Sequence, residues 1–169
     1  MYSPDRQANH CAFCGTRFQP TTTWPRDCPS CHETTWANPL PVAVTLLPTT
    51  DTDGTTNLVI VRRTIEPGSG LLALPGGYIE LGETWQQAAV RELREESHIE
   101  ADPNDVQLFH VDNSVRTIQI FALLPTRPVT DLPPSTPTPE ADGWHLLPAP
   151  TELAFPTHTT AARMFFENR

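Results

Sequence analysis

The segment from Gly77 to Ile99 reads GYIELGETWQQAAVRELREESHI, and the rest of the chain is interpreted outward from it. Thr84 can act as the N-cap of a helix, and Gln87, three residues later, can close a capping box with it. The glycines at positions 76, 77 and 82 precede this cap, where a tight loop needs their conformational freedom. The local sequence therefore predicts a loop, a helix over residues 84–97 and a second loop.

Three glutamates of the predicted helix, Glu92, Glu95 and Glu96, are spaced so that they share one face. That face overlaps the apolar stripe of the helix, formed by Trp85, Ala88, Ala89 and Leu93. The three carboxylates are therefore expected to turn inward, although like charges at this spacing repel and burial adds to the cost. A hard divalent cation such as Mg2+ offsets both effects, because it takes carboxylate oxygens and then bridges phosphate oxygens. A solvated acidic helix is the simpler alternative, and the overlap with the apolar stripe argues against it.

The same segment resembles the signature of the Nudix hydrolases, G-x5-E-x7-R-E-U-x-E-E-x-G-U, in which U is a bulky aliphatic residue. Residues 77–99 are called the box below. The matched positions are Gly77, Glu83, Arg91, Glu92, Leu93, Glu95, Glu96 and Ile99. The one departure is His98, where the pattern has glycine. That position follows the helix and is expected to need a positive φ, which histidine adopts more readily than most residues, at some cost in strain.

The resemblance covers the chain from about Pro41 to its end. It implies an α/β fold, the Nudix α/β/α sandwich with a mixed sheet, and metal-dependent hydrolysis of a pyrophosphate bond. It also implies that Glu92, Glu95 and Glu96 hold one to three Mg2+ or Mn2+ ions, together with a backbone carbonyl that maps onto Gly76. Glu83 and Arg91 resemble the family's charge pair that braces the loop. In-line attack of water on phosphorus depends mostly on such metal clamping and positioning.

The general base stays open between a box glutamate, acting through a metal-bound water of lowered pKa, and Glu140. Some relatives recruit a glutamate from the region that precedes Trp144, although a solvated loop residue is an equally good interpretation of Glu140. Arg62 and Arg63 end a predicted strand, so one of them is a candidate contact for a substrate phosphate. Ordinary surface arginines are as good an account of this pair. Tyr78 is a candidate for stacking on a base.

Two C-x2-C pairs, Cys11 with Cys14 and Cys28 with Cys31, contain all four cysteines and are separated by 13 residues. This spacing suits a tetrahedral four-cysteine zinc site, in which no position is left open for water. Two disulfides are the alternative, which the polar segment 1–10 disfavours because it is no secretory signal. A redox C-x-x-C needs no second copy, and the flanking His10 and His32 are expected to be bystanders. Residues 1–36 are thus predicted to form a structural zinc ribbon that needs its metal to fold, and residues 37–169 a Nudix domain.

The remaining elements follow from apolar runs and turn residues. Strands are predicted at residues 42–47, 58–61, 106–111, 115–124 and 144–147. The first two are expected to form a hairpin around the polar turn at residues 49–56. The Pro- and Thr-rich stretch over residues 125–139 is predicted to be a loop without regular structure. Residues 157–168 are predicted to form a closing helix packed on the core.

The composition narrows the classes of partner. The net charge of −9 disfavours nucleic acid or an anionic membrane surface as the main partner. An anionic substrate stays compatible, because bound cations invert the local field. No apolar run approaches the length that spans a membrane, so a cytoplasmic protein is expected. A homodimer is an expectation from the family resemblance alone.

A zinc ribbon ahead of a Nudix domain is similar to the NADH pyrophosphatases and to a shorter group that acts on FAD or ADP-ribose. The proline- and tryptophan-containing array of the NADH group, SQPWPFPxS, is absent from residues 109–114, whereas residues 63–67 and 153–156 resemble the shorter group. We therefore expect cleavage of FAD, ADP-ribose or NADH, in that order, with release of AMP. The alternatives are a nucleotide-binding regulatory module without hydrolysis and a nucleoside triphosphate pyrophosphatase. A nucleic-acid-binding ribbon is disfavoured, because residues 1–35 carry a neutral charge count.

Overall fold

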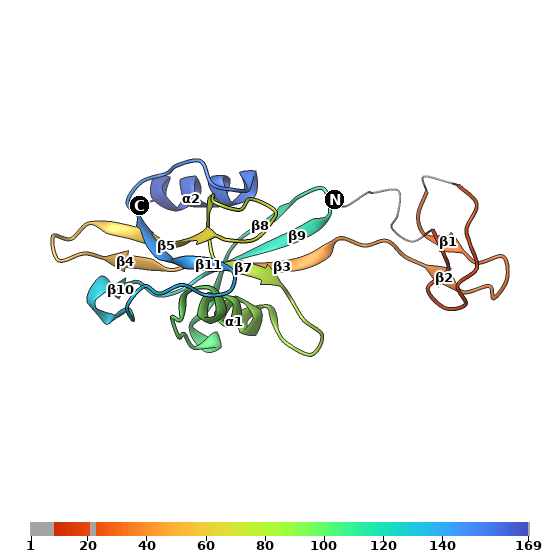
Figure 1. Ribbon diagram of the computed structural model, residues 1–169, viewed down its shortest axis with the longest axis horizontal. Coiled ribbons are helices and arrows are strands. Elements are labelled where there is room, and N and C mark those ends of the chain that lie inside the picture. Colours follow the sequence, from red (N-terminus) through yellow and green to blue (C-terminus); the bar gives the residue numbers. More distant parts are fainter. Residues whose placement is uncertain (1–8, 21–22, 169) are drawn as a thin grey trace. The chain divides into compact units, whose positions relative to one another are not determined.

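The computed structural model of the chain describes residues 9–20 and 23–168. The chain divides into two compact units, residues 1–39 and residues 40–169. The smaller unit contains an antiparallel pair of short strands, β1 (Arg26–Asp27) and β2 (Thr34–Thr35), beside the four cysteines. The larger unit contains two sheets and two α-helices within its described residues (Figure 1).

The first sheet of the larger unit is mixed, as the sequence predicted. Its strands lie in the order β7 (Gly76–Tyr78), β3 (Leu40–Leu46), β9 (Thr117–Leu123) and β8 (Gln107–Asn113). Strands β3 and β9 are parallel, whereas β7 and β8 are antiparallel to their neighbours. Strand β7 lies inside the segment that was expected to be a loop, and it brings the start of the box onto the edge of this sheet.

The second sheet has the order β10 (Arg127–Pro128), β4 (Pro48–Thr50), β5 (Thr56–Arg63) and β11 (Ala141–Leu147), and β6 (Leu72–Ala73) also pairs with β5. The predicted hairpin between residues 42–47 and 58–61 is wrong, because β3 and β5 lie in different sheets. The hairpin partner of β5 is β4. Every residue from 42 to 47 is buried, and a run that is apolar on both faces does not indicate which sheet it joins.

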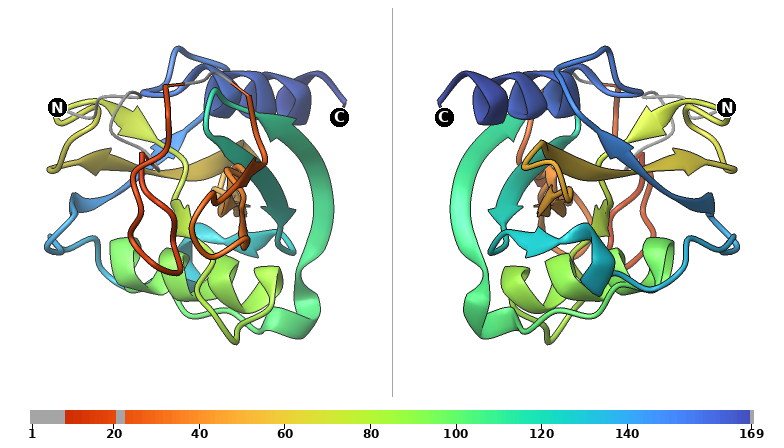
Figure 2. Two further views of the ribbon diagram at one scale, coloured as in Figure 1. Left: turned by 90° about the vertical axis from the view of Figure 1, so that its right-hand side faces the viewer. Right: turned by 90° about the vertical axis from the view of Figure 1, so that its left-hand side faces the viewer.

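Two helices cover the sheets from opposite sides, α1 (Trp85–Ser97) and α2 (Pro156–Glu167) (Figure 2). Helix α1 places its buried face in a core with Ala43, Val59 and Ala122. Helix α2 places its buried face in a second core with Val44 and Phe121. The two cores and the sheets between the helices give the α/β/α sandwich that the sequence predicted.

The prediction that residues 125–139 lack regular structure is wrong in part. The stretch contains β10 and the 3-10 turn η3 (Val129–Asp131), and a second 3-10 turn, η2 (Pro103–Asp105), follows the box. Strand β10 pairs in parallel with β4 through two residues. The rest of the stretch is tied to β11, since the Trp144 indole N–H donates to the carbonyl of Pro133 at 3.1 Å. A strand of two residues inside a proline-rich stretch cannot be predicted from composition alone.

Helix α1 begins and ends as its sequence predicted. Thr84 is the N-cap, and both hydrogen bonds of the capping box with Gln87 are present. His98 follows the last helical residue with φ of 60°, the left-handed conformation expected at this glycine position. Its N–H donates to the carbonyl of Arg94 at 2.8 Å and so closes the helix. The histidine thus satisfies the geometry of the box glycine, with the strain that a Cβ brings to positive φ.

We expect His98→Gly to stabilise the protein by up to about 1 kcal/mol, because glycine removes the left-handed strain and gives back only part of that gain as unfolded-state entropy. The side chain is exposed, so little packing is lost. The midpoint of urea unfolding measures the effect. His98→Ala serves as the control, since it removes the imidazole and keeps the strain. Equal stabilisation by alanine would contradict the backbone explanation.

Candidate active site and cysteine cluster

The entry to the box brings the chain unusually close to two glutamates of α1. The Gly76 N–H donates to Oε2 of Glu96 at 3.0 Å. A Cβ on Gly77 would lie 2.5 Å from Oε1 of Glu92, and a Cβ on Gly76 would lie 2.5 Å from the carbonyl oxygen of Ala43. These two glycines therefore permit close approach. Positive φ is required at Gly82 alone of the three glycines that precede the helix.

Two of the three box glutamates turn inward as predicted, and the third does not. Glu96 is 3% exposed and the side chain of Glu92 is 12% exposed, whereas the side chain of Glu95 is 50% exposed. At about 100° per residue, Glu96 lies about 40° from Glu92, within the buried arc, whereas Glu95 lies about 60° to the other side, beyond its edge. Spacing at i, i+3 and i+4 therefore does not by itself separate Glu95 from the buried Glu92 and Glu96.

Burial controls the ionisation of the two inward carboxyl groups. It raises the pKa of Glu96 to about 8, opposed by the hydrogen bond from the Gly76 N–H and by the charge of Arg63. Burial also raises the pKa of Glu92, against hydrogen bonding from Arg91. The charge of Glu140 adds to the increase at both groups. A buried carboxylate that is costly to ionise is one that a cation would stabilise, so this donor set fits a hard divalent ion.

Arg91 binds the loop of the box to its helix. Its Nε and Nη2 donate to the two carboxylate oxygens of Glu83 at 3.1 and 2.8 Å. Its Nη1 donates to Glu92 at 2.7 Å and to Glu95 at 3.0 Å, and its Nη2 also donates to the carbonyl of Tyr78 at 2.9 Å. Hydrogen bonding from Arg91 lowers the pKa of Glu83, and the acidic neighbours raise the pKa of the guanidinium further. Arg91 therefore keeps its charge at neutral pH and cannot act as an acid.

The two candidate arginines have different environments, because neighbouring residues of a strand point to opposite faces. Arg63 is 9% exposed, donates from Nε to the carbonyl of Pro67 at 2.9 Å, and places its guanidinium 5.3 Å from the centre of the Phe155 ring. Arg62 is exposed and pairs with Asp142 at 3.4 Å. Of the two, it is the charge of Arg63 that lowers the pKa of Glu96, against the effect of burial.

The other two candidates lie at the surface of the larger unit. Tyr78 is 58% exposed at the end of β7. Glu140 is exposed directly before β11, where its carbonyl accepts the Thr64 N–H at 2.9 Å. The negative charge of Glu140 adds to the raised pKa of Glu92 and of Glu96. Sequence reasoning missed His158 of α2, a buried residue that contacts the chain just before the box, since a single histidine in a helix gives no signal of its own.

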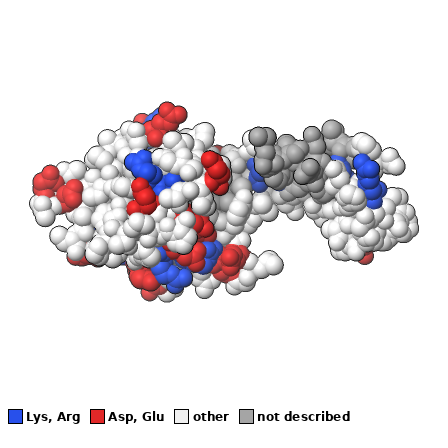
Figure 3. All heavy atoms as spheres, viewed as in Figure 1, with Lys and Arg blue, Asp and Glu red and all other residues white. Residues whose placement is uncertain are grey.

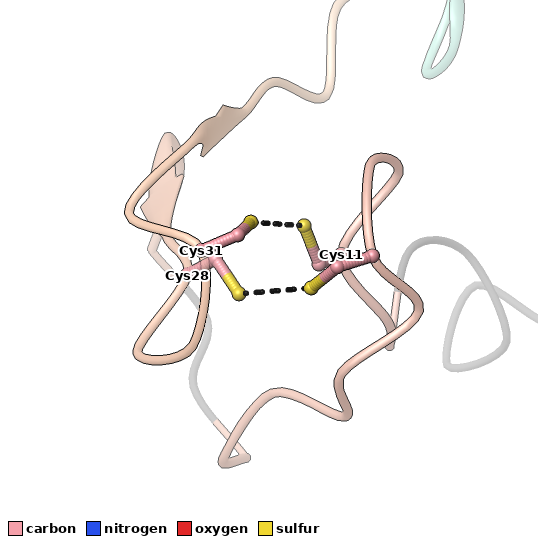
Figure 4. A group of neighbouring side chains, drawn as sticks. Cys11, Cys28 and Cys31 are labelled. Carbon is pink, nitrogen blue, oxygen red and sulfur yellow. Dashed lines mark hydrogen bonds between the residues drawn. The ribbon is translucent and has the colours of Figure 1, made fainter.

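The four cysteines form a compact group, three of which are labelled in Figure 4. The Sγ atoms of Cys11 and Cys31 lie 3.6 Å apart, those of Cys14 and Cys28 lie 3.5 Å apart, and all four lie within 4.8 Å of one another. A tetrahedral site with Zn–S bonds of about 2.3 Å has sulfur–sulfur edges of about 3.8 Å. All four thiols are free. Within the described residues, neither histidines nor the box carboxylates form a comparably tight group.

The two C-x2-C turns have matching geometry. In each, the residue after the second cysteine donates its N–H to the carbonyl of the first at 3.0 Å, Gly15 to Cys11 and His32 to Cys28. Both residues have positive φ, 75° and 63°. A main-chain N–H also donates to the first sulfur of each turn at 3.4 Å. Main-chain N–H groups lower the pKa of Cys11, which favours the thiolate form that binds metals.

The surface of the larger unit carries both signs of charge. On the face shown in Figure 3, acidic and basic side chains lie next to one another over the box and do not form a patch of one sign. No helix in the part of the chain that the structure describes is long and apolar enough to span a membrane.

Comparisons of the sequence and of the structure with known proteins agree on one family. The profile of the NUDIX domain matches residues 39–168. The chain is 28% identical over 95 residues to the NAD-capped RNA hydrolase NudC of Salmonella heidelberg, a match that covers 56% of this chain and 35% of that protein. The chain spans about a third or less of the length of the first curated relatives that it matches.

Two solved structures extend the comparison. The crystal structure of a NUDIX hydrolase from Nitrosomonas europaea has a TM-score of 0.72 and 24% identity, and the match covers 95% of this chain and 91% of that one. It shows the fold. A bifunctional NMN adenylyltransferase/ADP ribose pyrophosphatase from Francisella tularensis, solved with AMP and a manganese ion, has a TM-score of 0.51 and 28% identity. That match covers 66% of this chain and 34% of that one.

Proposed function

The chain belongs to the NUDIX domain family, and from this premise we propose that it is a divalent-metal-dependent pyrophosphohydrolase that cleaves the diphosphate of an ADP-containing substrate and releases AMP. The observation that supports this best is the buried carboxyl pair of Glu92 and Glu96 at the entry to the box. Their burial raises both pKa values, so ionising the pair costs free energy unless a bound cation offsets the charge. A module that binds nucleotides without cleaving them has no need of it.

Each side chain of the site has a role in this proposal. Glu92, Glu95, Glu96 and the carbonyl of Gly76 would hold Mg2+ or Mn2+, which when bound would supply positive charge for the phosphate oxygens and lower the pKa of a water molecule. Arg91 neutralises the excess acidic charge and holds the loop through Glu83. Glu140 and a box glutamate are the two candidates for the general base. The negative charge of Glu140 adds to the raised pKa of Glu96.

We assign the contact with a substrate phosphate to Arg63. Its Nε is engaged by Pro67, whereas its two Nη atoms make no hydrogen bond within the described part of the chain. Its charge lowers the pKa of Glu96, with which it forms no ion pair at 4.0 Å or less in that same part. A phosphate oxygen would accept hydrogen bonds from the free Nη atoms of the guanidinium, and a cation held by the carboxylates would be its partner on the other side. Arg62 is already held by Asp142 and by the carbonyl of Gly70.

For the substrate, we place ADP-ribose first and FAD and NADH after it. The Francisella relative is named for ADP-ribose and was solved with AMP, which is the half shared by all three candidates. NudC is named for NAD-capped RNA, so such an RNA is the natural further member of a panel. The net charge of −9 disfavours a long RNA contact, and the missing NADH array disfavours NADH.

The proposed function is tested by following products from ADP-ribose, FAD, NADH, NAD-capped RNA and nucleoside triphosphates in Mg2+ or Mn2+. We expect AMP from at least one ADP-containing substrate, and no product from Glu96→Gln. Inorganic pyrophosphate from a nucleoside triphosphate would favour the triphosphate alternative. Nucleotide binding without any product would favour the binding module and would overturn the proposal.

We propose a separate, structural role for the cysteines, which would hold one Zn2+. The proposal rests on the spacing of the two turns, their matched geometry and sulfur separations close to the edges of a zinc tetrahedron. Zinc content of the purified protein, measured with a metal-sensitive dye after thiol modification, tests it. One zinc per chain is expected, and a zinc-free folded ribbon would overturn the proposal.

A further inference from the structure

The segment Leu74–Gly76 carries the chain into the box, and each of its main-chain donors is held by a side chain. The Gly76 N–H donates to Glu96, Pro75 has no N–H, and the Leu74 N–H donates to Nδ1 of His158 at 3.2 Å. The carbonyl of Pro75 accepts the Thr45 N–H of β3 at 2.7 Å. Glu96 comes from α1 and His158 from α2, so the two helices hold the same three residues from opposite sides.

The bond from Leu74 to His158 is fixed by the core around it. Leu74 is 1% exposed and His158 is 4% exposed. The imidazole packs edge-on against the rings of Phe121 and Phe155, with centroids 5.9 and 4.9 Å away. Because the donor is a main-chain N–H, Nδ1 must be unprotonated and the proton of the neutral ring is on Nε2. Burial, aided by the charge of Arg63, lowers the pKa of His158 to about 3 and keeps it in this form.

We propose that His158 is a positioning residue for the active site: through the Leu74 N–H it sets the position of the Gly76 carbonyl and of the Gly76 N–H that orients Glu96. The imidazole itself touches neither carboxylate in any hydrogen bond or ion pair of the described residues. Its effect passes through two residues of main chain. This inference rests on the proposed metal-dependent function, because His158 would position the metal-binding Gly76 carbonyl and Glu96 without touching the metal itself.

The test compares two substitutions at the same position. His158→Phe keeps an aromatic ring in the core and removes the acceptor, so the Leu74 N–H is left buried without a partner. His158→Asn places an amide oxygen near the position of Nδ1. We expect Mn2+ affinity, measured by electron paramagnetic resonance of the free ion, to fall by about 10-fold or more in the Phe variant. The Asn variant should bind closer to wild type than the Phe variant does. Amide exchange in the peptide containing Gly76 should accelerate in the Phe variant, and kcat should fall more than KM rises.

Thr159→Val is the matched control. Thr159 lies next to His158 on α2, and its Oγ1 accepts the Leu153 N–H at 2.9 Å, so valine also removes one side-chain acceptor from a main-chain donor. We expect it to lower Tm without changing Mn2+ affinity or the exchange of Gly76.

The outcomes separate this inference from the function on which it rests. Wild-type protein that neither binds Mn2+ nor hydrolyses any substrate would overturn both. Wild-type protein that binds Mn2+, together with a His158→Phe variant that loses Tm but keeps Mn2+ affinity and Gly76 exchange, would overturn the positioning role alone. That second result would leave His158 as an ordinary buried histidine of the core.

Discussion

Glu96→Gln is expected to reduce hydrolysis by well over ~100-fold, which is the loss that removing a hydrogen-bond partner of a metal ligand can cause. The same substitution is expected to make the metal-free protein more stable near pH 8. The two effects have one cause. Glu96 is 3% exposed, and its charged form is needed by a cation but penalised by burial when no cation is bound. The amide of glutamine keeps an oxygen to accept the Gly76 N–H and has no charge to bury.

The pH dependence of stability follows from the sign of the shift. Burial raises the pKa of Glu96 from 4.5 to about 8, so the folded metal-free protein holds this proton more tightly than the unfolded chain does. Protonated Glu96 therefore makes its full contribution to the free energy of unfolding below pH 4.5, and this contribution is lost as pH rises through about 8. A shift of this size corresponds to a few kcal/mol for a group so buried. We expect the urea midpoint of the metal-free wild type to fall across this range, and that of Glu96→Gln to stay flatter.

Glu80→Gln is the matched control for both measurements. Glu80 lies in the loop of the box that precedes α1, and its side chain is exposed. We expect its substitution to change neither turnover nor the pH dependence of stability. Turnover by Glu96→Gln near the wild-type rate would remove Glu96 from the metal site. An unchanged pH profile would show that its carboxyl group is not buried in solution.

The box and its helix were predictable from sequence because their determinants are local. The capping box at Thr84 and Gln87, the length of α1 and the left-handed residue at His98 all depend on neighbours within one or two turns. The clustering of the cysteines was predictable for the same reason, since each C-x2-C pair makes its own turn. The α/β/α sandwich was predicted through the resemblance of the box to the Nudix signature, and the order of the apolar runs suited it.

What the sequence did not show depends on partners far along the chain. The hairpin assigned to β3 belongs to β4, because a strand buried on both faces has no side that indicates its sheet. Gly76 and Gly77 are needed for approach to Ala43 and Glu92, contacts that only the folded chain creates. His158 meets Leu74 across 84 residues, and no periodicity encodes such a pair.

Removal of the zinc that we propose for the cysteines, or Cys28→Ser, is expected to unfold the smaller unit and leave the larger one folded. Among its described residues, the buried core of the smaller unit consists of Cys11, Phe18 and Cys28, and its sheet has two residues in each strand. A core of this size cannot offset the conformational entropy of the chain without a cross-link. A structural zinc supplies about 10–16 kcal/mol of apparent binding free energy, which for such a domain is its folding free energy.

Hydrogen exchange measures the two units separately. Chelation should remove protection from β1 and β2 while the amides of α1 and α2 stay protected, because the larger unit has two buried cores of its own. Ser30→Ala is the control within the same turn, since Ser30 donates to the Cys28 sulfur through its main-chain N–H, which alanine retains. Protection of β1 and β2 in metal-free protein would contradict the structural role. Turnover is measured last, on the zinc-free protein: hydrolysis that persists with the ribbon unfolded would show that catalysis resides in the larger unit.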